Sequence, residues 1–119
     1  VRCRLTGRME TDDGTDLVLS IHVEGIRKEL AEALLILNYE GESAELYQDG
    51  RLVADSFYTG QSWEIGLKEL AHQQEADLIV VIHPLKESAG IYLEKWPVMK
   101  HHRACRLVNA ETAAIVQVE

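Results

Sequence analysis

NYEGESAELYQDGRLVADSFYTGQSWEIGL, residues 38–67, is the stretch that decides the fold of this 119-residue chain. Asp49-Gly50 at its centre is a dipeptide that readily adopts the positive φ angles of a two-residue type I′ turn, and apolar residues flank it on both sides. Residues 44–58 are therefore predicted to lie in an antiparallel sheet, with the hairpin of residues 44–55 turning at Asp49 and Gly50.

Short apolar segments continue in both directions from this hairpin. Leu17, Leu19 and Ile21 alternate with Val18 and Ser20, which is the period-2 pattern of a half-buried strand. Further strands are predicted at residues 2–9, 33–39, 63–67, 77–83, 91–94, 103–109 and 113–118, the last two as a pair around a turn at 110–112. Strands at spacings of about ten residues are typical of an antiparallel β-sandwich or jelly roll, so the fold class is all-β.

Two segments fit less simply into this pattern. Residues 26–34 have helical spacing of apolar side chains, but a loop leading into the strand at 33–39 is favoured. Residues 67–74 are predicted to form about two helical turns, and residues 11–15 a turn. One core is predicted to contain Leu19, Ile21, Leu35, Leu37, Leu46, Ile79, Val81 and Ile115.

Length and charge limit the classes of protein that fit. A chain of 119 residues is the size of one domain, and the absence of an initiator Met favours a piece of a longer polypeptide. The net charge of −8 disfavours nucleic acid and anionic membranes as partners, because both need a cationic surface. No apolar run is long enough for a membrane span, and no signal-peptide pattern opens the chain. The compartment stays open, with a slight preference for the cytoplasm.

The two cysteines, Cys3 and Cys105, lie near opposite ends of the sequence. They could form a bridge if the first strand and a late strand are neighbours, but two free thiols are favoured. There is no CxxC and no third cysteine, so the sequence predicts no structural zinc site built from cysteines.

Acidic residues are numerous, yet few are in a setting that suits catalysis. Asp55 before the aromatic residues and Glu64 beside Trp63 are the acids whose surroundings could raise a pKa, but hydrogen bonding in a turn and a solvated strand position explain them better. Ser56, Ser62 and Cys105 lack a nucleophile motif. We predict no catalytic residue and no cofactor.

Metal binding is also disfavoured by the sequence. His101 and His102 are adjacent, so their side chains would leave a strand on opposite faces, and a site combining one of them with His83 is improbable. Residues 12–16, DDGTD, suggest calcium but lack the alternating acids and the closing Glu of a calcium loop. An ordinary acidic turn is the better interpretation, and no metal is predicted.

Five of the seven aromatic residues lie between Tyr39 and Trp63. Tyr47, Tyr58 and Trp63 could form a platform on which the apolar face of a sugar stacks, with Asp55 or Glu64 accepting hydrogen bonds. The favoured alternative is that Phe57 and the body of Trp63 fill the core, while Tyr58, Gln61 and Glu64 are exposed on one rim.

The central stretch also resembles a known family. Residues 38–41, 44–47, 49–50, 52–55, 57–58, 60, 63–67 and 91–94 are similar to the segment that follows the catalytic barrel in some bacterial family 35 glycoside hydrolases, the β-galactosidases. The specific part of this resemblance covers about a quarter of the chain. It implies a galactose-binding-domain-like jelly roll, in which Asp49 stands where related domains often have Asn.

The resemblance implies a role beside catalysis. The family's two catalytic glutamates belong to the barrel, and no segment here matches them. The expected function is a non-catalytic accessory domain of a retaining glycoside hydrolase, which packs on the parent barrel. Contact with a galactoside, or self-association through the exposed interface, stays open. The contact candidates are Asp55, Tyr58, Gln61, Trp63 and Glu64; the alternatives are an autonomous carbohydrate-binding module and a β-sandwich protein-interaction domain.

Overall fold

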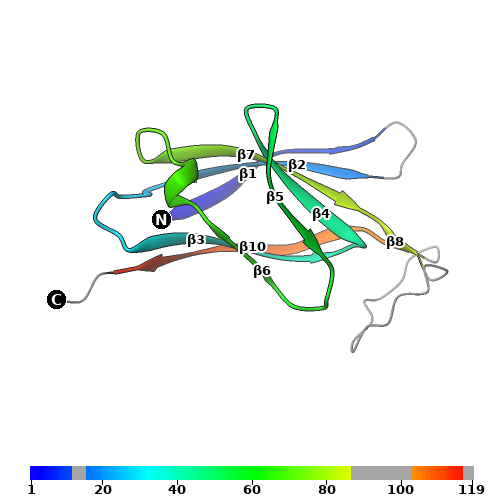
Figure 1. Ribbon diagram of the computed structural model, residues 1–119. Helices are drawn as coiled ribbons and strands as arrows, with labels where there is room; N and C mark the ends of the chain where they lie inside the picture. The colour runs from blue at the N-terminus through cyan, green and yellow to red at the C-terminus, as the bar shows by residue number, and fades with distance from the viewer. Residues whose placement is uncertain (12–15, 87–102, 117–119) are drawn as a thin grey trace.

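The computed structural model describes residues 1–11, 16–86 and 103–116, and these residues form mainly β-strands (Figure 1). The elements are β1 (Arg2–Glu10), β2 (Leu17–Glu24), β3 (Glu32–Glu40), β4 (Ser43–Gln48), β5 (Arg51–Phe57), β6 (Trp63–Gly66), the 3₁₀ turn η1 (Lys68–Leu70), β7 (Glu75–His83), β8 (Leu85–Lys86), β9 (Arg103–Ala104) and β10 (Arg106–Ile115). Among these residues no helix is long and apolar enough to span a membrane.

The strands form two main sheets. One has five strands in the order β1-β2-β7-β4-β5, and the other has three in the order β10-β3-β6, while β8 and β9 form a short separate ladder. The pairings between these described strands are antiparallel. Figure 1 shows the two sheets as two layers, and the buried side chains of both meet in one cluster. The predicted antiparallel β-sandwich is confirmed.

The core follows from the alternation of side chains along the strands. Leu19 and Ile21 of β2 are 1% and 2% exposed, and Leu35 and Leu37 of β3 are fully buried. Leu46 of β4 completes the group from the centre of the chain. Burial of each such side chain contributes roughly 1.5–3 kcal/mol, so this alternation is the main source of stability.

Three of the predicted core residues face outward instead. Ile79 and Ile115 are 37% and 45% exposed, and Val81 is half-buried, whereas Leu78, Val80 and Ile82 fill the core. The prediction was wrong for β7 because that strand is apolar at successive positions. Its own sequence pattern therefore does not indicate which alternate side chains point into the core. The register decides, since Val80 lies opposite the buried Leu19.

The predicted hairpin is present, with Asp49 and Gly50 at its tip. Their φ angles are 51° and 78°, as a type I′ turn requires. The β4–β5 pairing runs from Gln48↔Arg51 to Ser43↔Phe57, with an irregularity after Leu46 that leaves Val53 outside the ladder. The confirmed hairpin thus extends as far as Phe57.

The end of the chain differs from its prediction. Residues 106–115 form one continuous strand that pairs with the whole of β3, instead of two strands around a turn at 110–112. The segment 110–112 has no Gly or Pro that would break a strand, and its pairing with β3 keeps it extended. The pairing of β10 with β3 has a register shift between Leu107 and Asn109.

The structure also tests the predictions for residues 26–34 and 67–74. Residues 25–31 form a connection and not a helix, as predicted. The two helical turns predicted for residues 67–74 are wrong: η1 covers three residues, and a tight turn at Gln73 and Gln74 follows. The predicted strand at 91–94 and residues 12–15 of the acidic turn lie outside the described residues.

Candidate functional site

Three aromatic rings meet at the end of the sandwich where β3 ends and β6 begins. Tyr39 is buried, and its ring centre lies 5.7 Å from that of Tyr58 and 6.2 Å from that of Trp63, at interplanar angles of 58° and 70°. The hydroxyl of Tyr39 donates to Ser56 Oγ at 3.1 Å, and burial raises the pKa of Tyr39. The structure therefore brings together two predicted contact residues, Tyr58 and Trp63, around a core tyrosine.

Phe57 does not fill the core as predicted. It is 79% exposed, because it lies on β5, an edge strand, opposite Ser43 and on the outer face of the five-stranded sheet. Trp63 is half-buried and packs against the core, as expected for the body of its ring, and Tyr58 is also half-buried. We call Phe57, Tyr58 and Trp63 the aromatic rim, in which Tyr58 and Trp63 pack against Tyr39 and Phe57 faces outward from the edge of the five-stranded sheet.

The remaining predicted contact residues are exposed but do not converge. Gln61 lies in the β5–β6 connection beside the rim. Asp55 is paired with Glu45 on the outer face of the five-stranded sheet, whereas Glu64 is paired with Ile36 on the outer face of the three-stranded sheet. These two carboxylates therefore point to opposite sides of the sandwich. Tyr47 lies on the same outer face as Asp55, so it does not share a flat surface with Tyr58 and Trp63.

An ion pair lies beside the rim. Arg106 Nη2 donates to Glu40 Oε1 at 2.8 Å, and the Glu40 side chain is only 12% exposed. Glu40 Oε2 is buried and has no hydrogen-bond partner among the residues that the structure describes. Burial, and then the charge of Glu40, raises the pKa of Tyr58, so this end of the sandwich combines rings with a nearly buried carboxylate.

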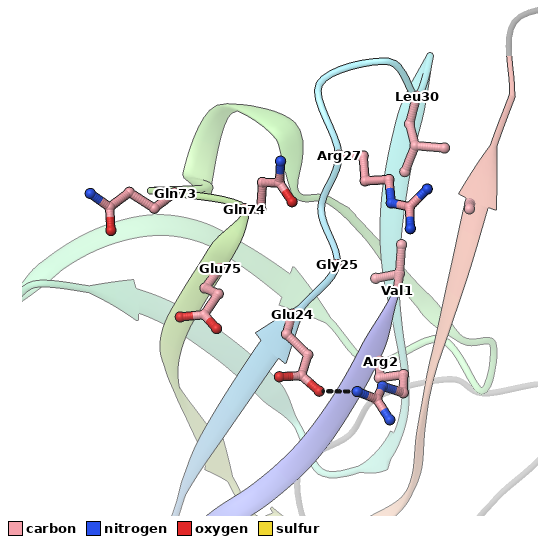
Figure 2. Close-up of a pocket in the computed structure, with 10 residues that line it drawn as sticks. Val1, Arg2, Glu24, Gly25, Arg27, Leu30, Gln73, Gln74 and Glu75 are labelled. Atoms are coloured by element: carbon pink, nitrogen blue, oxygen red, sulfur yellow. Dashed lines mark ion pairs between the residues drawn. The ribbon is translucent and has the colours of Figure 1, made fainter.

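A polar cleft of about 620 Å³ lies at the opposite end of the sandwich (Figure 2). Its walls come from the start of β1, the end of β2, the start of β7 and the β2–β3 connection. The polar side chains that line it are Arg2, Glu24, Arg27, Gln73, Gln74 and Glu75. Sequence reasoning did not find this cleft, because its walls are far apart in the chain.

The turn at the edge of this cleft has an unfavourable backbone. Gln73 and Gln74 have φ angles of 52° and 67°, which place both in the left-handed region. His72 and Glu75 exchange backbone hydrogen bonds of 2.7 and 3.1 Å across them. Glutamine has no local side-chain bond that favours this conformation, so the turn costs roughly 1–2 kcal/mol for each residue.

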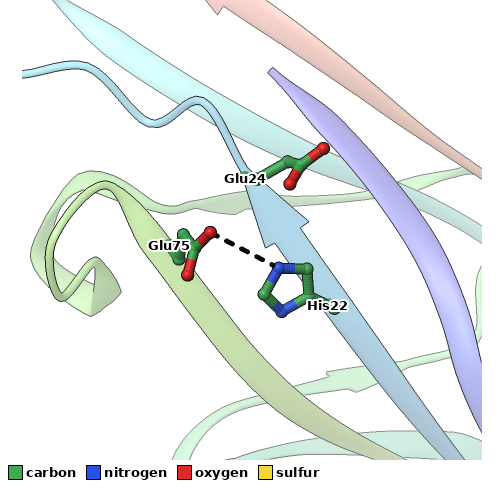
Figure 3. Close-up of side chains that lie close together, drawn as sticks. All are labelled: His22, Glu24 and Glu75. Carbon is green, nitrogen blue, oxygen red and sulfur yellow. Dashed lines mark ion pairs between the residues drawn. The ribbon is translucent and has the colours of Figure 1, made fainter.

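A histidine and three carboxylates meet next to the cleft. Figure 3 shows His22 and Glu24 on β2 with Glu75 on β7, and their ligand atoms lie within 4.8 Å of one another. His22 Nε2 is 3.9 Å from Glu75 Oε1, and Nδ1 is 2.7 Å from Asp77 Oδ1. The sequence contains a weak signal for this group, since His22 and Glu24, like Glu75 and Asp77, are two residues apart and so share one strand face.

His83 is held by two carboxylates at the other end of β7. Its Nδ1 lies 2.9 Å from Asp16 Oδ1 and its Nε2 lies 2.7 Å from Glu45 Oε1. The hydrogen bond to Glu45 is the main reason why the pKa of His83 is raised, and the same bond lowers the pKa of Glu45. Both ring nitrogens are therefore engaged. His101, His102 and residues 12–15 of the calcium-like segment lie outside the described residues.

Cys3 and Cys105 do not form a disulfide with each other, as favoured by the sequence. Cys3 Sγ lies 3.8 Å from the carbonyl oxygen of Ala110, and Cys105 Sγ lies 3.3 Å from that of Ile82. Partial burial raises the pKa of Cys3, which keeps it in the less reactive thiol form.

No family model, no curated protein and no solved structure matches this chain. The resemblance to the family 35 segment therefore stays a prediction from the sequence.

Proposed function

We propose that this chain is a non-catalytic accessory domain that packs on the catalytic barrel of a β-galactosidase-type glycoside hydrolase through its aromatic rim. The exposure of Phe57 carries the proposal, because a phenylalanine that is 79% exposed on an edge strand, next in sequence to the half-buried Tyr58, is typical of a surface that another protein surface covers. Residues 38–67, which resemble the family 35 segment, also build this rim. A galactose-binding-like jelly roll is the finer fold expected of such a domain.

The proposed role is binding without catalysis. A retaining glycosidase uses two carboxyl groups about 5 Å apart, and the sequence-predicted acids Asp55 and Glu64 face opposite sides of the sandwich. An autonomous carbohydrate-binding module is less well supported, because Tyr47 lies apart from Tyr58 and Trp63. Galactoside contact would then occur only at the joint surface with the barrel.

A second candidate function, a protein-interaction domain, is favoured by one further surface. The outer face of the five-stranded sheet carries Ile79 paired with Tyr47, and Tyr47 is in turn paired with Leu52. Met9 is paired with Val18, which is paired with Val81. Met9, Leu52 and Ile79 are 60%, 52% and 37% exposed, so this band presents apolar area to a partner.

Binding of the separately expressed chain to the other domains of its own gene product tests the proposal. We expect the barrel to bind, and Phe57→Ala to weaken that binding by about 30-fold or more, as truncation of a central aromatic residue does. Leu52→Ala is the control: it removes an exposed apolar side chain from the same outer face but at the hairpin end of β5, away from the rim, and should leave barrel binding unchanged. A gene that encodes no barrel, or a Phe57→Ala variant that binds the barrel as the wild type does, would refute the proposal. If Leu52→Ala weakens binding and Phe57→Ala does not, the result would favour the second surface.

A further inference from the structure

We propose that His22, Glu24 and Glu75 form a zinc-binding site where β2 ends and β7 begins. This proposal does not depend on the accessory-domain function or on the aromatic rim, which lies at the other end of the sandwich. Strand pairing builds the site, because β2 and β7 are neighbours with Glu24 opposite Glu75 and His22 opposite Asp77. The relevant side chains therefore leave the sheet on one face.

The distances suit a metal better than a direct hydrogen bond. His22 Nε2 and Glu75 Oε1 are 3.9 Å apart, which is too long for a hydrogen bond. In a tetrahedral zinc site with bonds of about 2.0–2.2 Å, neighbouring ligand atoms lie roughly 3.4 Å apart. The three ligand atoms already lie within 4.8 Å of one another, so side-chain rotations of the glutamates are sufficient to close the site.

Asp77 orients the His22 ring so that Nε2 faces the glutamates. Asp77 Oδ1 is 2.7 Å from His22 Nδ1, so in the neutral ring the proton is on Nδ1 and the Nε2 lone pair faces the glutamates. In this tautomer the Nε2 lone pair is available to coordinate a metal ion on the side of the glutamates. Zinc-binding histidines are commonly oriented in this way by a carboxylate on the other nitrogen. The His22 side chain is 14% exposed, which limits the freedom of its ring.

The donor set favours zinc among the common divalent ions. Calcium and magnesium prefer oxygen donors alone, whereas one imidazole nitrogen with two carboxylates suits zinc. Three protein ligands leave the fourth position for water, on the side of the polar cleft that Glu24 and Glu75 line. Arg2 competes, because its Nη2 lies 2.7 Å from Glu24 Oε1. The Arg2 side chain is 83% exposed, so this ion pair is weak and Glu24 can exchange it for the metal.

Zinc titration of the untagged chain tests the site, with affinity measured against a chromophoric chelator at neutral pH. We expect saturable binding of zinc that His22→Gln weakens by about 100-fold or more, and that Asp77→Asn weakens by about 10–100-fold. Arg2→Gln should strengthen binding, because it frees Glu24. If these residues only stabilised the fold, Asp77→Asn would not weaken zinc binding while Arg2→Gln strengthened it.

The control is His72→Gln, which removes an exposed histidine three residues before Glu75 and should leave zinc affinity unchanged. Circular dichroism checks that each variant is folded, and Glu75→Gln, at a side chain that is 55% exposed, replaces His22→Gln if the latter unfolds. The proposal is overturned by the absence of saturable zinc binding, by unchanged affinity in His22→Gln or its replacement, or by an equal loss in His72→Gln.

Discussion

His83 Nε2 lies 2.7 Å from Glu45 Oε1 and joins β7 to β4, while the other nitrogen of the same ring lies 2.9 Å from Oδ1 of Asp16, the residue just before β2. One imidazole thus connects β7 and β4 with the residue that precedes β2. Tyr47 donates to the second oxygen of Glu45 at 3.1 Å, which holds that carboxylate in place.

This arrangement predicts a pH-dependent contribution to stability. The pKa of His83 is raised in the folded state, so its contribution is complete below the ordinary value of 6.5 and is lost as the pH rises through the folded value. The pKa of Glu45 is lowered, so its contribution is present above 4.5 and is lost as the pH falls through the folded value. The interaction between His83 and Glu45 should therefore stabilise the fold most between pH 4.5 and pH 6.5.

We therefore expect His83→Gln to lower the free energy of unfolding by about 1 kcal/mol or less near pH 5.5, and by less near pH 9. Denaturant unfolding of both proteins across this pH range measures the difference. His72→Gln, at an exposed histidine, is the control and should show no such pH dependence. An equal loss from His83→Gln at both pH values would contradict the prediction.

The orientation of β7 predicts unequal effects of two neighbouring substitutions. Leu78→Ala should cost about 2–5 kcal/mol, because Leu78 is 1% exposed and its removal leaves a cavity. Ile79→Ala should cost less than about 1 kcal/mol, because Ile79 lies on the outer face. Urea unfolding distinguishes the two, and equal losses would mean that β7 does not present these faces.

The hairpin tip predicts a penalty that comes from the backbone alone. Within the described part of the chain, a Cβ at Gly50 would meet nothing within 4 Å, so steric clash does not explain a loss in Gly50→Val, but its φ of 78° is unfavourable for a β-branched residue. We expect a loss of about 1–2 kcal/mol in the free energy of unfolding. Gly50→Asn, which tolerates this region better, should lose clearly less. If both variants melt as the wild type does, the turn is not of type I′.

Gly41 predicts a penalty of the opposite kind, from crowding. A Cβ there would lie 2.6 Å from both the carbonyl oxygen of His83 and Cγ2 of Ile82, so the backbone would have to move. Gly41→Ala should cost about 1–3 kcal/mol in thermal unfolding. Gly66→Ala is the matched control, since its nearest contact, at 3.1 Å, is the end of the Glu32 side chain and not backbone; moving that carboxylate strains only its hydrogen bonds from the Ala33 and Lys68 N–H groups, so we expect a smaller loss. The reverse order of the two losses would be inconsistent with this packing.

Much of the fold could be predicted from the sequence because its signals are local. The alternation in β2 and the Asp49-Gly50 turn each specify a strand or hairpin without reference to the rest of the chain. The inward face of β7 could not be predicted, since both of its faces are apolar and the pairing with β2 decides. The continuity of β10 likewise depends on β3, which is some seventy residues earlier.

The candidate sites show the same division. Tyr58 and Trp63 were found because they are close in sequence, whereas the outward turn of Phe57 follows from its position on an edge strand. The group of His22, Glu24 and Glu75 was missed because two strands about fifty residues apart must pair before the side chains meet. Sequence patterns on single strands suggest which residues share a face, but not which faces adjoin.

The side-by-side positions of β1 and β10 determine how the fold would respond to a mechanical load. Thr112 Oγ1 donates to the carbonyl oxygen of Val1 at 2.9 Å, so β1 begins beside the last part of β10, at one end of the sandwich. Each is an edge strand of its own sheet, with β2 and β3 as the respective neighbours. A force that separates residues 1 and 116 would break this contact first. It would then peel the two edge strands away one ladder hydrogen bond at a time, because those bonds lie across the strands and open in sequence from the loaded end. Such unzipping needs far less force than shearing a whole ladder at once, so the chain would act as a compliant element in any longer polypeptide under tension.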